Sequence, residues 1–134
     1  MDKSYVTAKV SVNCIIVKDG KVLLVQQNRP EDVRGKWSVP GGKVNQEETF
    51  EDAVKREVKE ETGLNVIGSE RLSIKQEKPH QTVKHIFKVE AEGEVVFPED
   101  ELMDAKWFSP EEIRKIKDQL RKPWVLEAIE EYFE

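Results

Sequence analysis

Acidic side chains are crowded into the segment REVKEETGL, which runs from Arg56 to Leu64. Within this segment, a span of five residues contains Glu57, Glu60 and Glu61. Ionised carboxylates that are close together and partly desolvated repel one another strongly, so such a group either takes up protons or binds cations. Hard divalent metal ions prefer oxygen ligands and are the natural partners of this cluster.

The direction of these carboxylates follows from the helix that the segment is expected to form. At about 100° per residue, Phe50, Val54, Glu57 and Glu61 fall along one stripe, and Glu60 lies beside it. The stripe begins with apolar residues, so its glutamates should meet the rest of the protein or a cleft beside it. The alternative is a solvated helix face held by pairs of acidic and basic residues four positions apart.

The residues before this segment complete a longer pattern. Gly42 is followed after five residues by Glu48 and, after seven more, by Arg56 and the rest of REVKEETGL. This pattern resembles the Nudix box of the Nudix hydrolase family at every fixed position. The flanking segments GKWSVPGGKV and AKWFSPEEI are also similar to parts of that family. The resemblance implies a single Nudix hydrolase domain over residues 1–134. The implied fold is α/β (α+β), an α/β/α sandwich with a mixed β-sheet.

The resemblance also implies an activity and a set of metal ligands. The activity is metal-dependent hydrolysis of a nucleoside diphosphate linked to another group, with Mg²⁺ as the expected cofactor and Mn²⁺ as the alternative ion. Family members usually hold the metal through the glutamates that match Glu57 and Glu61. The backbone carbonyl of the residue that matches Gly41 often joins them. The glutamate that matches Glu60 is a further ligand or the general base.

Two further site residues are assigned by the same resemblance. Arg56 is expected to pair with Glu48 and to orient the site. Many family members bring in one more carboxylate from a late loop, and Glu101 in the segment PEDELMD is the candidate here, as metal ligand or base. The alternative is that this segment is a solvated acidic loop. The basic residues near the box that could meet phosphates are Arg29, Arg34 and Lys36.

The rest of the chain predicts the elements that must position this site. Thr49 and Asp52 form a capping signal before the box helix, and Gly63 suits its end. A second capping box begins at Ser109, and Trp124 is expected to anchor the last helix. Apolar patterns and turn signals predict strands at about 6–17, 22–27, 37–39, 64–76, 82–91 and 95–97, a short strand ending at 108, and helices at about 49–61, 110–120 and 124–133.

The composition narrows the partners and the compartment. With 22 basic and 27 acidic residues, the chain has a formal net charge of −5, which argues against a broad basic surface for a nucleic acid polymer. No stretch approaches the ~20 apolar residues of a membrane span. The single cysteine, Cys14, permits no internal disulfide. The expected location is therefore cytoplasmic and the expected partner a small-molecule nucleotide, and a homodimer is compatible with the sequence.

The sequence does not decide between several substrates. A nucleoside triphosphate, oxidised forms included, is the first expectation, in a house-cleaning role. ADP-ribose or another nucleotide sugar is the alternative substrate. A non-catalytic nucleotide-sensing domain is the alternative of another class, and the complete set of Glu57, Glu60 and Glu61 speaks against it.

Overall fold

The mixed β-sheet at the centre of the fold is described by a computed structural model of residues 7–77 and 82–133. Within these residues a seven-stranded sheet has the order β3-β2-β1-β6-β5, with β4 paired to β1 and β7 paired to β2. Strands β1 and β6 run parallel and the other pairs are antiparallel, so the predicted mixed sheet is confirmed. The strands are β1 (Val10–Lys18), β2 (Lys21–Gln27), β3 (Trp37–Ser38), β4 (Gly41–Lys43), β5 (Asn65–Glu77), β6 (Thr82–Glu92) and β7 (Leu102–Phe108).

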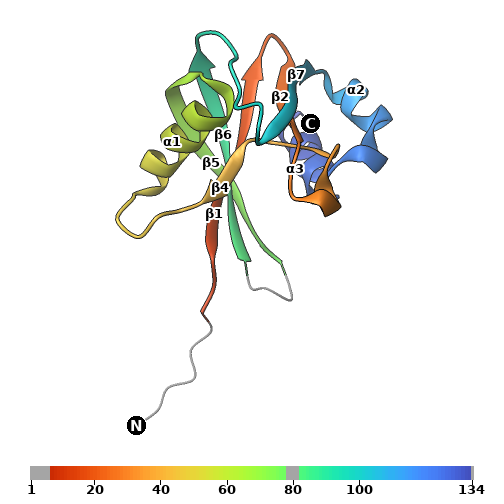
Figure 1. Ribbon diagram of the computed structural model, residues 1–134. Helices are drawn as coiled ribbons and strands as arrows, with labels where there is room; N and C mark the ends of the chain where they lie inside the picture. The colour runs from red at the N-terminus through yellow and green to blue at the C-terminus, as the bar shows by residue number, and fades with distance from the viewer. Residues whose placement is uncertain (1–6, 78–81, 134) are drawn as a thin grey trace.

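Helices cover both faces of this sheet (Figure 1). One face carries α1 (Phe50–Thr62), and the other carries α2 (Pro110–Lys115) and α3 (Trp124–Tyr132). Each side has its own cluster of buried apolar residues, which includes Val54 and Val58 beneath α1 and Ile113 and Ile129 on the other side. The arrangement is the expected α/β/α sandwich. None of the described helices is long and apolar enough to cross a membrane.

Strand β1 divides the two sides residue by residue, because successive side chains of a strand point to opposite faces. Cys14 and Ile16 pack with the α1 side, whereas Ile15 packs with the α3 side. Ser11 and Asn13 alternate with the same period and so share the face of Ile15; both are buried. On the face of β1 that packs toward α3, two polar side chains therefore precede the apolar Ile15.

Capping residues fix the starts of α1 and α2 as predicted. The Thr49 hydroxyl accepts a hydrogen bond from the Asp52 backbone at 3.1 Å, and the Asp52 carboxylate accepts one from the Thr49 backbone. Gly63 ends α1 with a φ of 76°, in the left-handed region that favours glycine. Ser109 and Glu112 form the second capping box, at α2.

The strand prediction is wrong at three points, which are the start of one strand, one strand that was missed and one strand that does not form. The first strand begins at Val10 rather than near Val6: residues 7–9 are not part of it, and Val6 lies outside the described residues. Strand β4 was not predicted; it forms because its backbone pairs with β1. No strand forms at 95–97, where the Val96 N–H bonds to the Thr62 carbonyl at the end of α1 instead of to a neighbouring strand.

The second helix also ends earlier than predicted. It stops at Lys115, and a 3₁₀ turn, η2 (Lys117–Gln119), follows; a second such turn, η1 (Glu31–Val33), lies after β2. After η2 the chain is held by the sheet, because Leu120 bridges to Trp37 and the Arg121 N–H donates to the Trp37 carbonyl at 2.8 Å. These long-range contacts, which no local pattern contains, turn the chain away from a continued helix.

Candidate active site

A cavity of about 400 Å³ lies beside the C-terminal half of α1, and we call it the acidic pocket. It brings together residues that the sequence had singled out from three separate segments. The loop before β7 supplies Glu101, β4 supplies Gly41, and α1 supplies the remaining glutamates. The full lining is Gln27, Arg29, Pro30, Gly41, Glu57, Glu60, Glu61, Glu101 and Leu102.

Two carboxylates meet in this pocket. Glu57 is only 9% exposed, and Glu61 is partly buried beside it, close enough for their side chains to share a hydrogen bond. Burial, followed by the neighbouring Glu57, raises the pKa of Glu61 well above its usual range, while the Gly41 N–H at 3.0 Å from Oε2 opposes that rise. The pair therefore resists full ionisation unless a cation joins it.

Two glycines allow β4 to pass close to this pair. Gly41 and Gly42 pair with Asn13 and Val12 of β1. A Cβ on Gly41 would collide with the Val12 backbone carbonyl, whereas a Cβ on Gly42 would lie 2.6 Å from the carboxyl carbon of Glu57. The sheet thus requires the first glycine, and the carboxylate site requires the second.

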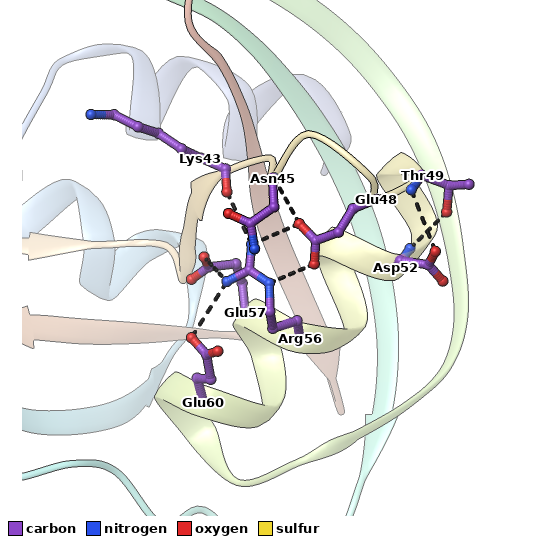
Figure 2. A network of polar contacts seen from close by, with 8 residues as sticks. All are labelled: Lys43, Asn45, Glu48, Thr49, Asp52, Arg56, Glu57 and Glu60. Carbon is purple, nitrogen blue, oxygen red and sulfur yellow. Dashed lines mark hydrogen bonds and ion pairs between the residues drawn. The ribbon is translucent and has the colours of Figure 1, made fainter.

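Arg56 ties the glutamates of the site together (Figure 2). Its Nε and Nη2 donate to the Glu48 carboxylate at 2.6 and 2.9 Å, so the pairing expected from the sequence is present. Its Nη1 donates to Glu57 at 2.7 Å and reaches Glu60 at 3.5 Å, and Nη2 also donates to the Lys43 carbonyl at 3.0 Å. The hydrogen bond from Arg56 lowers the pKa of Glu48. The guanidinium thereby links α1, the loop before it and β4.

The donor set of the acidic pocket fits a hard divalent cation. Adjacent carboxylates of Glu57 and Glu61 supply the oxygen ligands that such ions prefer. Within residues 7–77 and 82–133, no three acidic, histidine or cysteine side chains are gathered into a complete metal-binding group. Glu60 lies near Arg56, with its side chain 58% exposed. The Glu57–Glu61 pair is therefore the part of the predicted ligand set that is already assembled.

The structure separates the basic residues near the box. Arg29 lines the acidic pocket, and its Nη2 lies 3.3 Å from the carboxylate of Glu101, which lines the same pocket. Arg34 and Lys36 instead bond to Asn28 and to the Asp118 carbonyl, outside this lining. Arg29 is thus the basic residue of the three that a phosphate in this pocket would meet.

A second cavity, of about 500 Å³, adjoins the first, and we call it the basic pocket. The two pockets share Gln27, Gly41 and Glu61. Trp124, which packs at the start of α3 as predicted, forms part of its wall. The lining is Ser11, Asn13, Gln27, Ser38, Val39, Gly41, Gly42, Lys43, Glu61, Thr82, Lys84, Arg121, Lys122 and Trp124.

Sequence reasoning missed most of this second lining. One signal was available, because Ser11 and Asn13 interrupt the apolar run VSVNCIIV at every second position. The basic residues Lys84, Arg121 and Lys122 gave none, since each stands in a segment of ordinary surface composition. Their grouping depends on the pairing of β6 with β1 and on the path of the chain after η2.

Comparisons with known proteins agree on one relationship. The model of the NUDIX domain family matches residues 7–128. Phosphatase NudJ from Shigella boydii serotype 4 is 34% identical over 130 residues, which are 92% of this chain and 82% of that protein. An ADP-ribose pyrophosphatase from Methanocaldococcus jannaschii is 49% identical over 61 residues, which are 45% of this chain and 35% of that protein. The chain spans only 28% and 32% of two other curated relatives.

Solved structures show the same likeness. The structure is similar to that of a NUDIX hydrolase from Nitrosomonas europaea, with a TM-score of 0.80 and 28% sequence identity. That likeness covers 95% of this chain and 89% of the other. It therefore extends over both faces of the sheet and includes the helices on each side.

Proposed function

The chain belongs to the Nudix family, and we propose that it is a divalent-metal-dependent pyrophosphohydrolase that cleaves a nucleoside diphosphate linked to another group. The observation that carries the proposal is the contact between the carboxylates of Glu57 and Glu61 in the acidic pocket, with the Gly41 backbone beside them. We also propose that residues 1–134 form one Nudix hydrolase domain and that it works in the cytoplasm.

The ligands of the cation come from one helix and one strand. Glu57 and Glu61 would hold it, with Glu60 and the Gly41 carbonyl as further ligands. When bound, Mg²⁺, or Mn²⁺ as the alternative, supplies neutralisation of the diphosphate charge and activation of the attacking water. Arg56 positions the ligands, because its guanidinium contacts Glu57 and Glu60 while it is fixed by Glu48.

The reaction forms one bond from a water oxygen to phosphorus and breaks one bridging phosphorus–oxygen bond. The oxygen of the broken bond stays with the departing phosphate. The proton lost by the water goes to a carboxylate, and Glu60 and Glu101 are the candidates because both line the pocket with side chains at least half exposed. Arg29 lies at Glu101 and can face the phosphates.

For the substrate, we propose a nucleoside triphosphate, with oxidised nucleotides included, in a house-cleaning role. ADP-ribose or a nucleotide sugar is the second candidate, and the similarity to the ADP-ribose pyrophosphatase from Methanocaldococcus jannaschii favours it. Product analysis separates the two, because a triphosphate gives a nucleoside monophosphate and pyrophosphate, whereas ADP-ribose gives AMP and ribose 5-phosphate.

The test is a substrate panel with Mg²⁺ or with EDTA, applied to the parent protein, to Glu61→Gln and to Glu51→Gln. Glu51 is exposed on the same helix outside both pockets, so its substitution is a matched control. We expect Glu61→Gln to keep the circular dichroism spectrum of the parent and to lose most of its activity. Glu51→Gln should keep both the spectrum and the activity. Turnover by Glu61→Gln at the parent rate with Mg²⁺ would refute the assignment. Binding of nucleotides without cleavage under any of these conditions would favour the sensing domain.

A further inference from the structure

The charge of the basic pocket is opposite to that of the acidic pocket it adjoins. Four glutamates and one arginine line the acidic pocket. The basic pocket has a single acidic residue, Glu61, which the two cavities share. In a chain with a net charge of −5, a cavity with this balance indicates an anionic ligand. The basic residues that line it are Lys43, Lys84, Arg121 and Lys122.

The fold holds these cations in place. Lys84 is opposite Ser11 in the parallel register of β6 and β1, and its Nζ lies 5.4 Å from the ring centroid of Trp124. The Arg121 N–H is bonded to the Trp37 carbonyl at 2.8 Å, so the backbone of this loop is fixed to β3 while the Arg121 side chain stays exposed. In Figure 2 the Lys43 side chain points away from the network around Arg56.

The floor of the basic pocket is polar although it is buried. Ser11, Asn13 and Ser38 are 7–8% exposed, and they make up three of the six buried polar or charged residues in the described part of the chain. Asn13 Nδ2 donates to Ser11 Oγ at 3.1 Å, and the remaining hydrogen-bonding capacity of these side chains gives this wall a polar lining that suits a polar ligand.

We propose that the basic pocket binds a phosphate group that the substrate carries away from its scissile diphosphate. This inference rests on the proposed function, and of its two substrate candidates it favours the second, the ADP-ribose or nucleotide-sugar class, in forms that carry an additional, remote phosphate. Arginine and lysine together suit such a group, since arginine donates in a fork and lysine adds a compact charge. The shared wall at Gly41 and Glu61 lets one ligand span both pockets, and about 500 Å³ is the size of a small-molecule site.

The test compares substrates that differ by one phosphate. ADP-ribose is paired with ADP-ribose 2′-phosphate, and dephospho-coenzyme A with coenzyme A, and kcat/KM is measured with Mg²⁺. We expect the parent to prefer the phosphorylated member by at least about tenfold, which is the effect of one hydrogen bond between charged groups. The double variant Arg121→Gln/Lys122→Gln should lose that preference, measured as the ratio of the two kcat/KM values in each pair. The control Lys115→Gln/Lys117→Gln removes two exposed charges outside the pocket and should keep the preference.

A binding measurement makes the result independent of catalysis. Calorimetry in EDTA compares adenosine 2′,5′-bisphosphate with AMP, and we expect the bisphosphate to bind the parent at least about tenfold more tightly and to lose this advantage in Arg121→Gln/Lys122→Gln. Equal affinities, no binding of either ligand, or an equal loss in the Lys115/Lys117 control would overturn the inference. A preference in binding, with no hydrolysis of these compounds or of nucleoside triphosphates in Mg²⁺, would retain the inference and refute the proposed function. Hydrolysis of both members of a pair at equal kcat/KM would support the proposed function and overturn the inference about the basic pocket.

Discussion

Replacement of Gly42 by alanine should separate the activity of this protein from its stability. The added Cβ would meet the Glu57 side chain, with the carboxyl carbon 2.6 Å away and Oε2 at 2.8 Å. The closest approach is to Glu57 Oε1, and ordinary contact begins near 3.4 Å, so the carboxylate must move by about 1 Å. The backbone itself accepts alanine, because Gly42 lies in β4 with no positive φ.

The expected magnitudes follow from what has to move. The end of a glutamate side chain can shift, and alanine restricts the unfolded chain, which stabilises a compatible site by about 0.4–1 kcal/mol. Loss of the Arg56–Glu57 contact works against that gain, so we expect the free energy of unfolding to stay within about 1 kcal/mol of the parent. A displacement near 1 Å at a metal ligand should lower kcat/KM by about 10².

Gly41→Ala is the matched control, because its Cβ would strike the Val12 backbone and lie 3.0 Å from the Asn13 Cα. Backbone atoms of a paired strand cannot yield easily, so this variant should lose about 1–3 kcal/mol of unfolding free energy. Urea denaturation and steady-state kinetics with saturating Mg²⁺ check both variants. Parent-like kcat/KM in Gly42→Ala, or a stability loss as large as that of Gly41→Ala, would refute the reasoning.

Other substitutions test the remaining parts of the site and the fold. In EDTA, the raised pKa of Glu61 means that the folded protein retains a proton above about pH 4.5, where the unfolded chain has lost it. The stability should therefore fall as the pH rises from about 4.5 to the pKa of Glu61 in the folded protein. Glu61→Gln removes this loss and should melt at a higher temperature than the parent at neutral pH in EDTA; parallel melting curves across the same pH range would contradict it. Arg56→Lys cannot keep the forked contact with Glu48, so its Mg²⁺ dependence of kcat/KM should show a metal affinity lower by about 10- to 100-fold, and an unchanged affinity would argue against a positioning role. Ser109→Ala removes the α2 cap and should cost about 1 kcal/mol in urea denaturation with kcat/KM unchanged, whereas a loss of activity would mean that α2 reaches the site.

Much of the site could be predicted because its decisive features are local. The box helix is defined within its own residues by the Thr49 cap, the Gly63 terminus and the apolar stripe. The same rotation that buries Val54 directs Glu57 inward, and the structure confirms that Glu57 is buried. A helical period fixes these directions before any tertiary contact forms.

The unpredicted parts depend on contacts between distant segments. Strand β4 is three residues long and carries two glycines, so no pattern marks it; its pairing with β1 creates it. The predicted helix to Leu120 was cut short for a similar reason, because the chain after η2 is held by Trp37. Short elements of this kind gain their stability from the partner strand rather than from their own residues.

The sequence by itself determined that carboxylates gather on one helix and face inward, since that result needs only the spacing of residues along α1. Tertiary structure alone decided what lies next to them. It placed Gly41 beside the Glu57–Glu61 pair of α1. It also placed Lys84 beside Ser11, and the loop that contains Arg121 beside Trp37. Periodicity fixes the direction of a side chain, but only the pairing of strands and the packing of loops fix its neighbours, and these neighbours define both pockets.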